Sequence, residues 1–136
     1  VMAQTILVVD DDPVQRRLLE TAISRGGMQV VTAPGGQPAL DLINGPRGDQ
    51  ITLMLLDLVM PPGVYDACVQ RLLDSGAHAR VCLLSGSSAQ ALAQERARID
   101  ALGLPTTSPI TKPARLDALA SLLASLHPAA EPSRES

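Results

Sequence analysis

The chain has 136 residues, of which 46% are apolar, 18% are charged and only 1% are aromatic. This length is enough for one domain that buries a core without disulfides or a structural metal, and that core must be aliphatic. The net charge of −3 excludes the strongly basic surface that binding to nucleic acid or to an anionic membrane requires.

No apolar run approaches the roughly 18 residues that a membrane-spanning helix needs, and the chain does not open with a secretory signal pattern. The two cysteines, Cys68 and Cys82, lie in apolar sequence without the spacing of metal ligands. We therefore expect both to be reduced core residues of a cytoplasmic protein.

Apolar runs of strand length alternate with segments of helical periodicity, which predicts βα units and a parallel sheet. The first helix is expected to have Asp12 as its N-cap and Pro13 as its first residue, and to end at Gly26-Gly27. The last strand contains two prolines, so we expect it to be short or at an edge of the sheet. The five expected strands cover residues 5–9, 28–32, 51–56, 80–84 and 104–111.

The last expected helix, residues 114–126, has leucines at helical spacing and ends at His127-Pro128. We expect residues 1–127 to form one domain and residues 128–136 to be a disordered tail or a linker. Five βα units predict an α/β fold with a doubly wound, five-stranded parallel sheet. Its expected strand order is the flavodoxin-like 2-1-3-4-5, with helices on both faces.

Polar side chains follow four of the expected strands: Asp10 and Asp11 follow the first, Asp57 follows the third, Ser85 the fourth and Lys112 the fifth. Because the carboxyl ends of parallel strands meet at one edge of a sheet, we expect these side chains to form one pocket. Two carboxylates 4 Å apart repel each other by about 1 kcal/mol in water and about 4 kcal/mol at an effective dielectric constant of 20. The pocket should therefore favour a dication, and an all-oxygen set of ligands with room for water suits Mg²⁺.

The same pocket is suited to phosphoryl transfer. An aspartate is ionised at neutral pH and needs no general base to attack phosphorus, so Asp57 is a candidate nucleophile. Lys112, the only lysine of the chain, can neutralise charge on the phosphoryl oxygens, and Ser85 can donate a hydroxyl. We interpret Pro113 as a residue that aims the lysine through a cis peptide bond.

Four motifs together resemble those of a known family: ILVVDDDP at 6–13, LMLLDLVMP at 53–61, LLSG at 83–86 and TKP at 111–113. Over about residues 4–126 the chain resembles the receiver domain of two-component response regulators, the CheY-like superfamily. The stretch at 83–104 also resembles receivers that are linked to cyclic-dinucleotide phosphodiesterase output domains.

The resemblance implies a phosphoacceptor and a metal site. By that resemblance Asp57 accepts a phosphoryl group from a phosphohistidine on a histidine kinase or a histidine phosphotransfer protein. Asp10, Asp11 and Asp57, together with the backbone carbonyl of Val59, would hold Mg²⁺.

The resemblance also implies a route for the signal. Ser85 and Gly86 would form the switch segment that turns toward the phosphate, and Lys112 would pair with it. The change would then reach an output domain or a downstream protein through the face of the fourth helix, fifth strand and fifth helix. The family usually has an aromatic residue three positions before the lysine, where this chain has Pro109, so we expect the usual aromatic coupling to be altered.

The sequence leaves three functions open: a phosphorylatable signalling switch, a docking module that works without phosphorylation, and a small Mg-dependent phosphohydrolase. The last would need an aspartate two residues after the nucleophile, where this chain has Val59. We expect no enzymatic activity beyond self-catalysed phosphoryl transfer and autodephosphorylation, and no binding to nucleic acid or membrane. The sequence does not decide whether the domain forms a homodimer.

Overall fold

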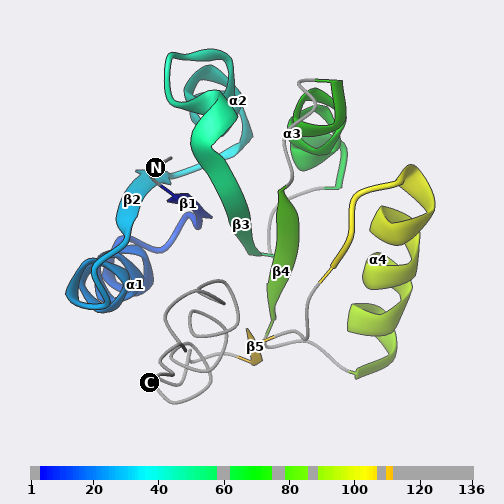
Figure 1. Ribbon diagram of the computed structural model, residues 1–136. Helices are drawn as coiled ribbons and strands as arrows, with labels where there is room; N and C mark the ends of the chain where they lie inside the picture. Colours follow the sequence, from blue (N-terminus) through cyan, green and yellow to red (C-terminus); the bar gives the residue numbers. More distant parts are fainter. Residues whose placement is uncertain (1–3, 58–61, 75–78, 86–88, 107–109, 112–136) are drawn as a thin grey trace, which may run out of the picture.

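The structure is a computed structural model that describes residues 4–57, 62–74, 79–85, 89–106 and 110–111. Its centre is a parallel sheet with the strand order β2-β1-β3-β4-β5, flanked by helices (Figure 1). The strands are β1 (Thr5–Val9), β2 (Gln29–Ala33), β3 (Ile51–Asp57), β4 (Arg80–Ser85) and β5 (Ile110–Thr111). The helices are α1 (Pro13–Arg25), α2 (Gly36–Asn44), α3 (Pro62–Asp74) and α4 (Ala89–Leu102), with a 3-10 turn, η1 (Gly48–Gln50).

The core consists of two aliphatic clusters that lie on opposite faces of the sheet. Alternate residues of one strand point to opposite faces, so Leu7 belongs to one cluster whereas Ile6 belongs to the other. The first cluster includes residues of α2, α3 and α4, and the second includes Leu19 and Ile23 of α1. Each central strand is therefore buried on both faces, as its continuous apolar sequence predicts.

The four longer strands have the expected order 2-1-3-4, which is confirmed. The fifth strand is only two residues long and pairs with β4 at the edge of the sheet. An isolated bridge joins Val81 of β4 to Thr106, and Leu84 of β4 pairs with Ile110. The two β4 residues are three apart in the sequence and their partners are four apart, so the pairing register changes by one residue between them. The expected helix at 114–126 and the expected tail at 128–136 lie outside the described residues.

Local sequence explains where α1 begins and ends. The side chain of Asp12 accepts a hydrogen bond from the amide of Val14 at 3.0 Å, and Pro13 occupies the first helical position, so the predicted start is confirmed. Gly27 follows the helix with φ of +87°, a conformation that glycine adopts without steric cost. In the part of the chain that the structure describes, no helix is both long enough and apolar enough to cross a membrane.

Both cysteines are buried and reduced, as predicted. The Cys68 thiol donates to the carbonyl of Gly36 at 3.5 Å, which joins α3 to the start of α2. Burial raises the pKa of this thiol to about 11, so it stays protonated at neutral pH and acts as a packing residue.

We expect Gly48→Ala to destabilise the fold, because a Cβ at this position would lie 1.8 Å from the carbonyl oxygen of Ile43. Relief of that overlap requires a backbone shift, which should lower the free energy of unfolding by about 2 kcal/mol or more. Gly35→Ser is the matched control, because nothing lies within 4 Å of its added Cβ and serine is a favoured N-cap. Chemical denaturation of both variants measures the difference; equal midpoints would contradict the close approach.

Candidate functional site

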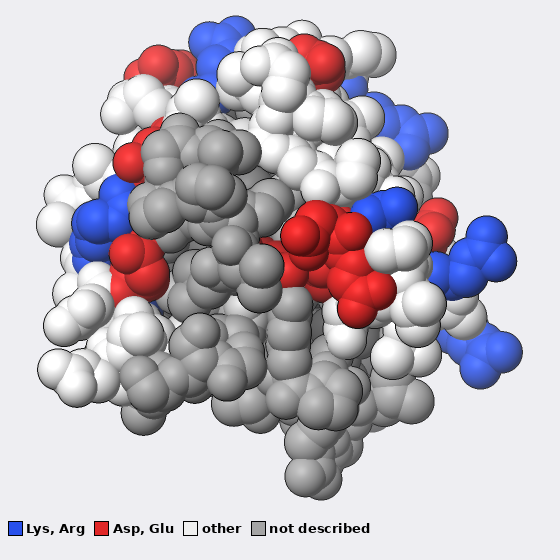
Figure 2. Space-filling model, turned by 180° about the vertical axis from the view of Figure 1, so that it is seen from behind, with Lys and Arg blue, Asp and Glu red and all other residues white. Residues whose placement is uncertain are grey.

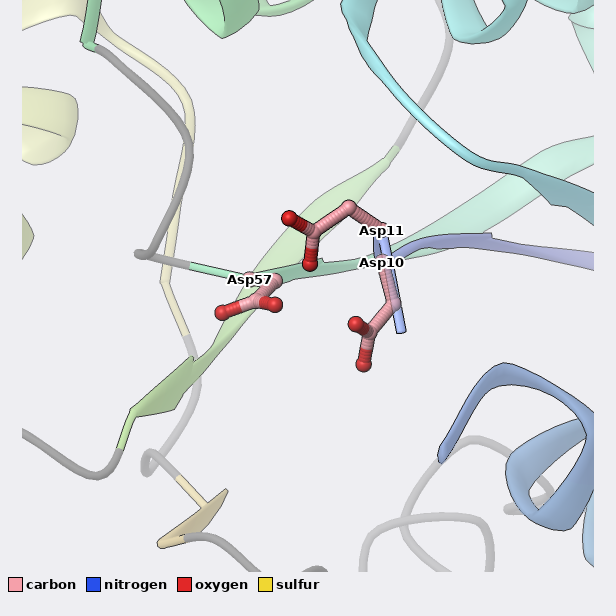
Figure 3. A group of neighbouring side chains, drawn as sticks. All are labelled: Asp10, Asp11 and Asp57. Carbon is pink, nitrogen blue, oxygen red and sulfur yellow. The ribbon is translucent and has the colours of Figure 1, made fainter. Parts of the chain in front are cut away.

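Three carboxylates lie together where two neighbouring strands end. Asp10 and Asp11 directly follow β1, and Asp57 is the last residue of β3, which pairs with β1 in the middle of the sheet. One carboxylate oxygen from each residue lies within 4.8 Å of the other two (Figure 3). The predicted convergence of these acids is therefore confirmed.

The three acids differ in their exposure to solvent. Asp10 and Asp57 are completely buried, whereas Asp11 is exposed. The carboxylate of Asp10 is fixed by its own turn, since its Oδ1 accepts a hydrogen bond from the amide of Asp12 at 2.9 Å. The site thus has two buried acids at its base and one acid that faces water.

This arrangement fits a divalent cation with oxygen ligands. Three carboxylates this close repel one another, and a dication would relieve that repulsion. With one carboxylate oxygen of each residue within 4.8 Å of the other two, Asp10, Asp11 and Asp57 are the residues that would hold such an ion. The exposed side, next to Asp11, leaves room for the waters that Mg²⁺ usually keeps.

The remaining predicted site residues are placed only in part. Ser85 is the last residue of β4, and its Cα pairs in register with Thr111 of β5. Its backbone therefore lies at the same edge of the sheet as the acids, as predicted. The other predicted site residues lie outside the described part of the chain: Val59, Gly86, Pro109, Lys112 and Pro113.

One polar contact at this site was not predicted from the sequence. Nη1 of Arg16, in the first turns of α1, donates a hydrogen bond of 2.7 Å to the main-chain oxygen of Asp10. Side chains of a helix lean toward its N-terminus, so an arginine four residues after the N-cap Asp12 can reach back to the end of β1. That spacing is the signal by which the contact could have been found.

A sheet of this order with an acidic cluster at the carboxyl ends of β1 and β3 is the architecture of a receiver domain. The chain matches the family "Response regulator receiver domain" over residues 6–124 and belongs to that family.

Longer proteins of known type contain a segment similar to this chain. The chain is 37% identical over 119 residues to the sensor histidine kinase RcsC of Salmonella typhi. These residues make up 88% of this chain and 12% of that protein. It is 36% identical over 86 residues to the 3',5'-cyclic-nucleotide phosphodiesterase regA of Dictyostelium discoideum. That match covers 61% of this chain and 11% of that protein. The chain therefore spans about one eighth of the length of these longer relatives.

Solved structures show the same fold at low sequence identity. A response regulator receiver protein from Pseudomonas putida matches with a TM-score of 0.73 and 24% identity, covering 92% of this chain and 98% of that one. The chemotaxis protein CheY4 of Vibrio cholerae matches with a TM-score of 0.72 and 20% identity over the same shares of the two chains.

We expect Asp11→Asn to raise the melting temperature of the metal-free protein, because it removes one of three mutually repelling charges. A gain of about 1 kcal/mol, the repulsion of one pair in water, corresponds to a few degrees for a domain of this size. The same variant should gain less stability from added Mg²⁺ than the wild type does.

Thermal unfolding with a chelator and then with Mg²⁺ measures both effects. Glu20→Gln is the control, since it removes a negative charge from the exposed side of α1. If Asp11→Asn and Glu20→Gln behave alike under both conditions, the acids do not act as a repelling, metal-binding group.

Proposed function

We propose that this chain is a phosphorylatable signalling switch of a two-component phosphorelay. In this function Asp57 accepts a phosphoryl group from a histidine kinase or a histidine phosphotransfer protein, with Mg²⁺ as cofactor. The observation that carries the proposal is the position of Asp57, buried at the end of β3 with its carboxylate within 4.8 Å of Asp10 and Asp11. Membership of the receiver family supports it.

The chemistry requires little beyond position and charge. A carboxylate oxygen of Asp57 forms the new bond to phosphorus while the phosphorus–nitrogen bond of the donor breaks, and that electron pair stays on the donor imidazole, which takes up a proton. Asp10 and Asp11 would hold Mg²⁺ together with Asp57 and the carbonyl of Val59. When bound, the ion neutralises charge on the transferring phosphoryl oxygens.

Ser85 and Lys112 complete the proposed site. Ser85 ends the strand next to β3, and Thr111, its partner in register, immediately precedes Lys112. The hydroxyl of Ser85 and the amide of Gly86 would bind the phosphoryl oxygens, and the ammonium of Lys112 would pair with them. Pro113 would restrict the backbone that carries the lysine.

The proposed output is the face formed by α4, β5 and the expected last helix. The segment before β5 is tied to α4, because Thr106 accepts a hydrogen bond from Nε of Arg96 and donates one to Asp100, both at 3.0 Å. This link supports a coupling between α4 and β5 that does not use an aromatic at Pro109. The receiver unit is proposed to span residues 1–127, with 128–136 as a linker or tail.

Asp57→Asn should abolish phosphorylation by the small donor acetyl phosphate in the presence of Mg²⁺. The wild type should gain the mass of one phosphoryl group, measured on the intact protein, and should gain none when Mg²⁺ is chelated. Asp49→Asn, an exposed acid before β3, is the matched control and should be phosphorylated like the wild type.

Three other results would change the assignment. Equal labelling of Asp57→Asn and wild type would exclude Asp57 as the acceptor. Sustained release of phosphate from simple phosphate esters, with no lasting phosphoprotein, would favour the phosphohydrolase. A wild type that gains no mass and binds no Mg²⁺ would favour the docking module.

A further inference from the structure

The turn between β1 and α1 is fixed by hydrogen bonds on both sides of Asp11. The amide of Asp10 donates to the carbonyl of Ala33 in β2 at 3.1 Å, and Oδ1 of Asp10 accepts from the amide of Asp12 at 2.9 Å. The main-chain oxygen of Asp10 accepts from Nη1 of Arg16 at 2.7 Å. This last bond is the only one of the three that comes from a side chain outside the turn.

Arg16 is joined to the turn at two points. Its backbone amide donates to the carbonyl of Asp12 at 2.9 Å, and its guanidinium bonds to Asp10. Asp11 lies between these two attachment points, so its backbone is held although its side chain is exposed. Figure 2 shows several acidic groups on the face it draws, the largest of them a patch of adjoining acidic side chains with a basic side chain at its border.

We propose that Arg16 is a positioning residue for the cation that this acidic site binds; the inference rests on the proposed function of the site. Arg16 holds the main chain of Asp10 and Asp11 so that their carboxylates and that of Asp57 meet at one point. It does not coordinate the ion, because a guanidinium has no acceptor. It acts on the ligands in the way that outer hydrogen-bond partners orient the ligands of other metal sites.

The charge of Arg16 and its hydrogen bond have opposite effects on cation binding. A positive guanidinium beside the site repels a dication, so removal of the charge alone should make Mg²⁺ bind a few-fold more tightly. Loss of an outer partner of metal ligands typically weakens binding by about tenfold or more. The direction of the change in affinity therefore distinguishes a positioning residue from a nearby charge.

The test is the dissociation constant for Mg²⁺, measured by calorimetric titration of the whole chain. Arg16→Gln should bind Mg²⁺ about tenfold more weakly than the wild type. Arg16→Lys keeps the charge and one donor that can reach the carbonyl of Asp10, so it should recover part of that loss. Arg17→Gln is the control, because it removes the same charge from the next, exposed position of α1 and should leave Mg²⁺ binding equal or slightly tighter.

The melting temperature of each metal-free variant separates positioning from general stability. Arg16→Gln should lose affinity in titrations made well below its own melting temperature. An Arg16→Gln affinity equal to or tighter than that of Arg17→Gln would overturn the role of Arg16 and leave the proposed function intact. Absence of Mg²⁺ binding by the wild type would overturn both. If Arg16→Gln does not fold, Arg16→Lys decides: weaker binding than the wild type supports the role, and binding equal to that of the wild type overturns it.

Discussion

The parallel pairing of β1 with β3 is the constraint on which the site depends. It brings Asp10 and Asp57, which are far apart in the sequence, to the same edge of the sheet and buries both. Carboxylates that repel one another would separate if they stood on loops. Here the backbone hydrogen bonds and the two aliphatic clusters of a five-stranded sheet hold them together. The stability of the core thus maintains an arrangement of charges that is unfavourable by itself.

Much of this architecture could be predicted from the sequence, because the strands that matter are buried on both faces. The uniformly apolar runs before Asp10 and Asp57 give a clear strand signal, and the acids at their ends follow from the geometry of parallel sheets. The start of α1 was equally predictable, since Asp12-Pro13 combines a side-chain cap with a proline at the first helical position.

Other features were not predicted, for physical reasons that differ. The pairing of β5 shifts by one residue between Thr106 and Ile110, and such a shift depends on neighbouring strands and not on local propensity. The bond from Arg16 to Asp10 joins residues that are only six apart in the sequence, and in the sequence Arg16 resembles an ordinary exposed arginine of an amphipathic helix. Hydrophobic patterning carries no information about either contact.

The alternation of β3 between the two core clusters has a mechanical consequence. Leu55 packs with the cluster beneath α1, and Leu56 packs with the cluster beneath α2, α3 and α4. Asp57 follows these residues directly, at the end of a strand that is packed on both faces of the sheet. A displacement of this strand end would therefore change the packing of the helices on both faces of the sheet at once. The face whose helices repack at the lower cost in free energy would then be the face to which a chemical change at Asp57 is transmitted.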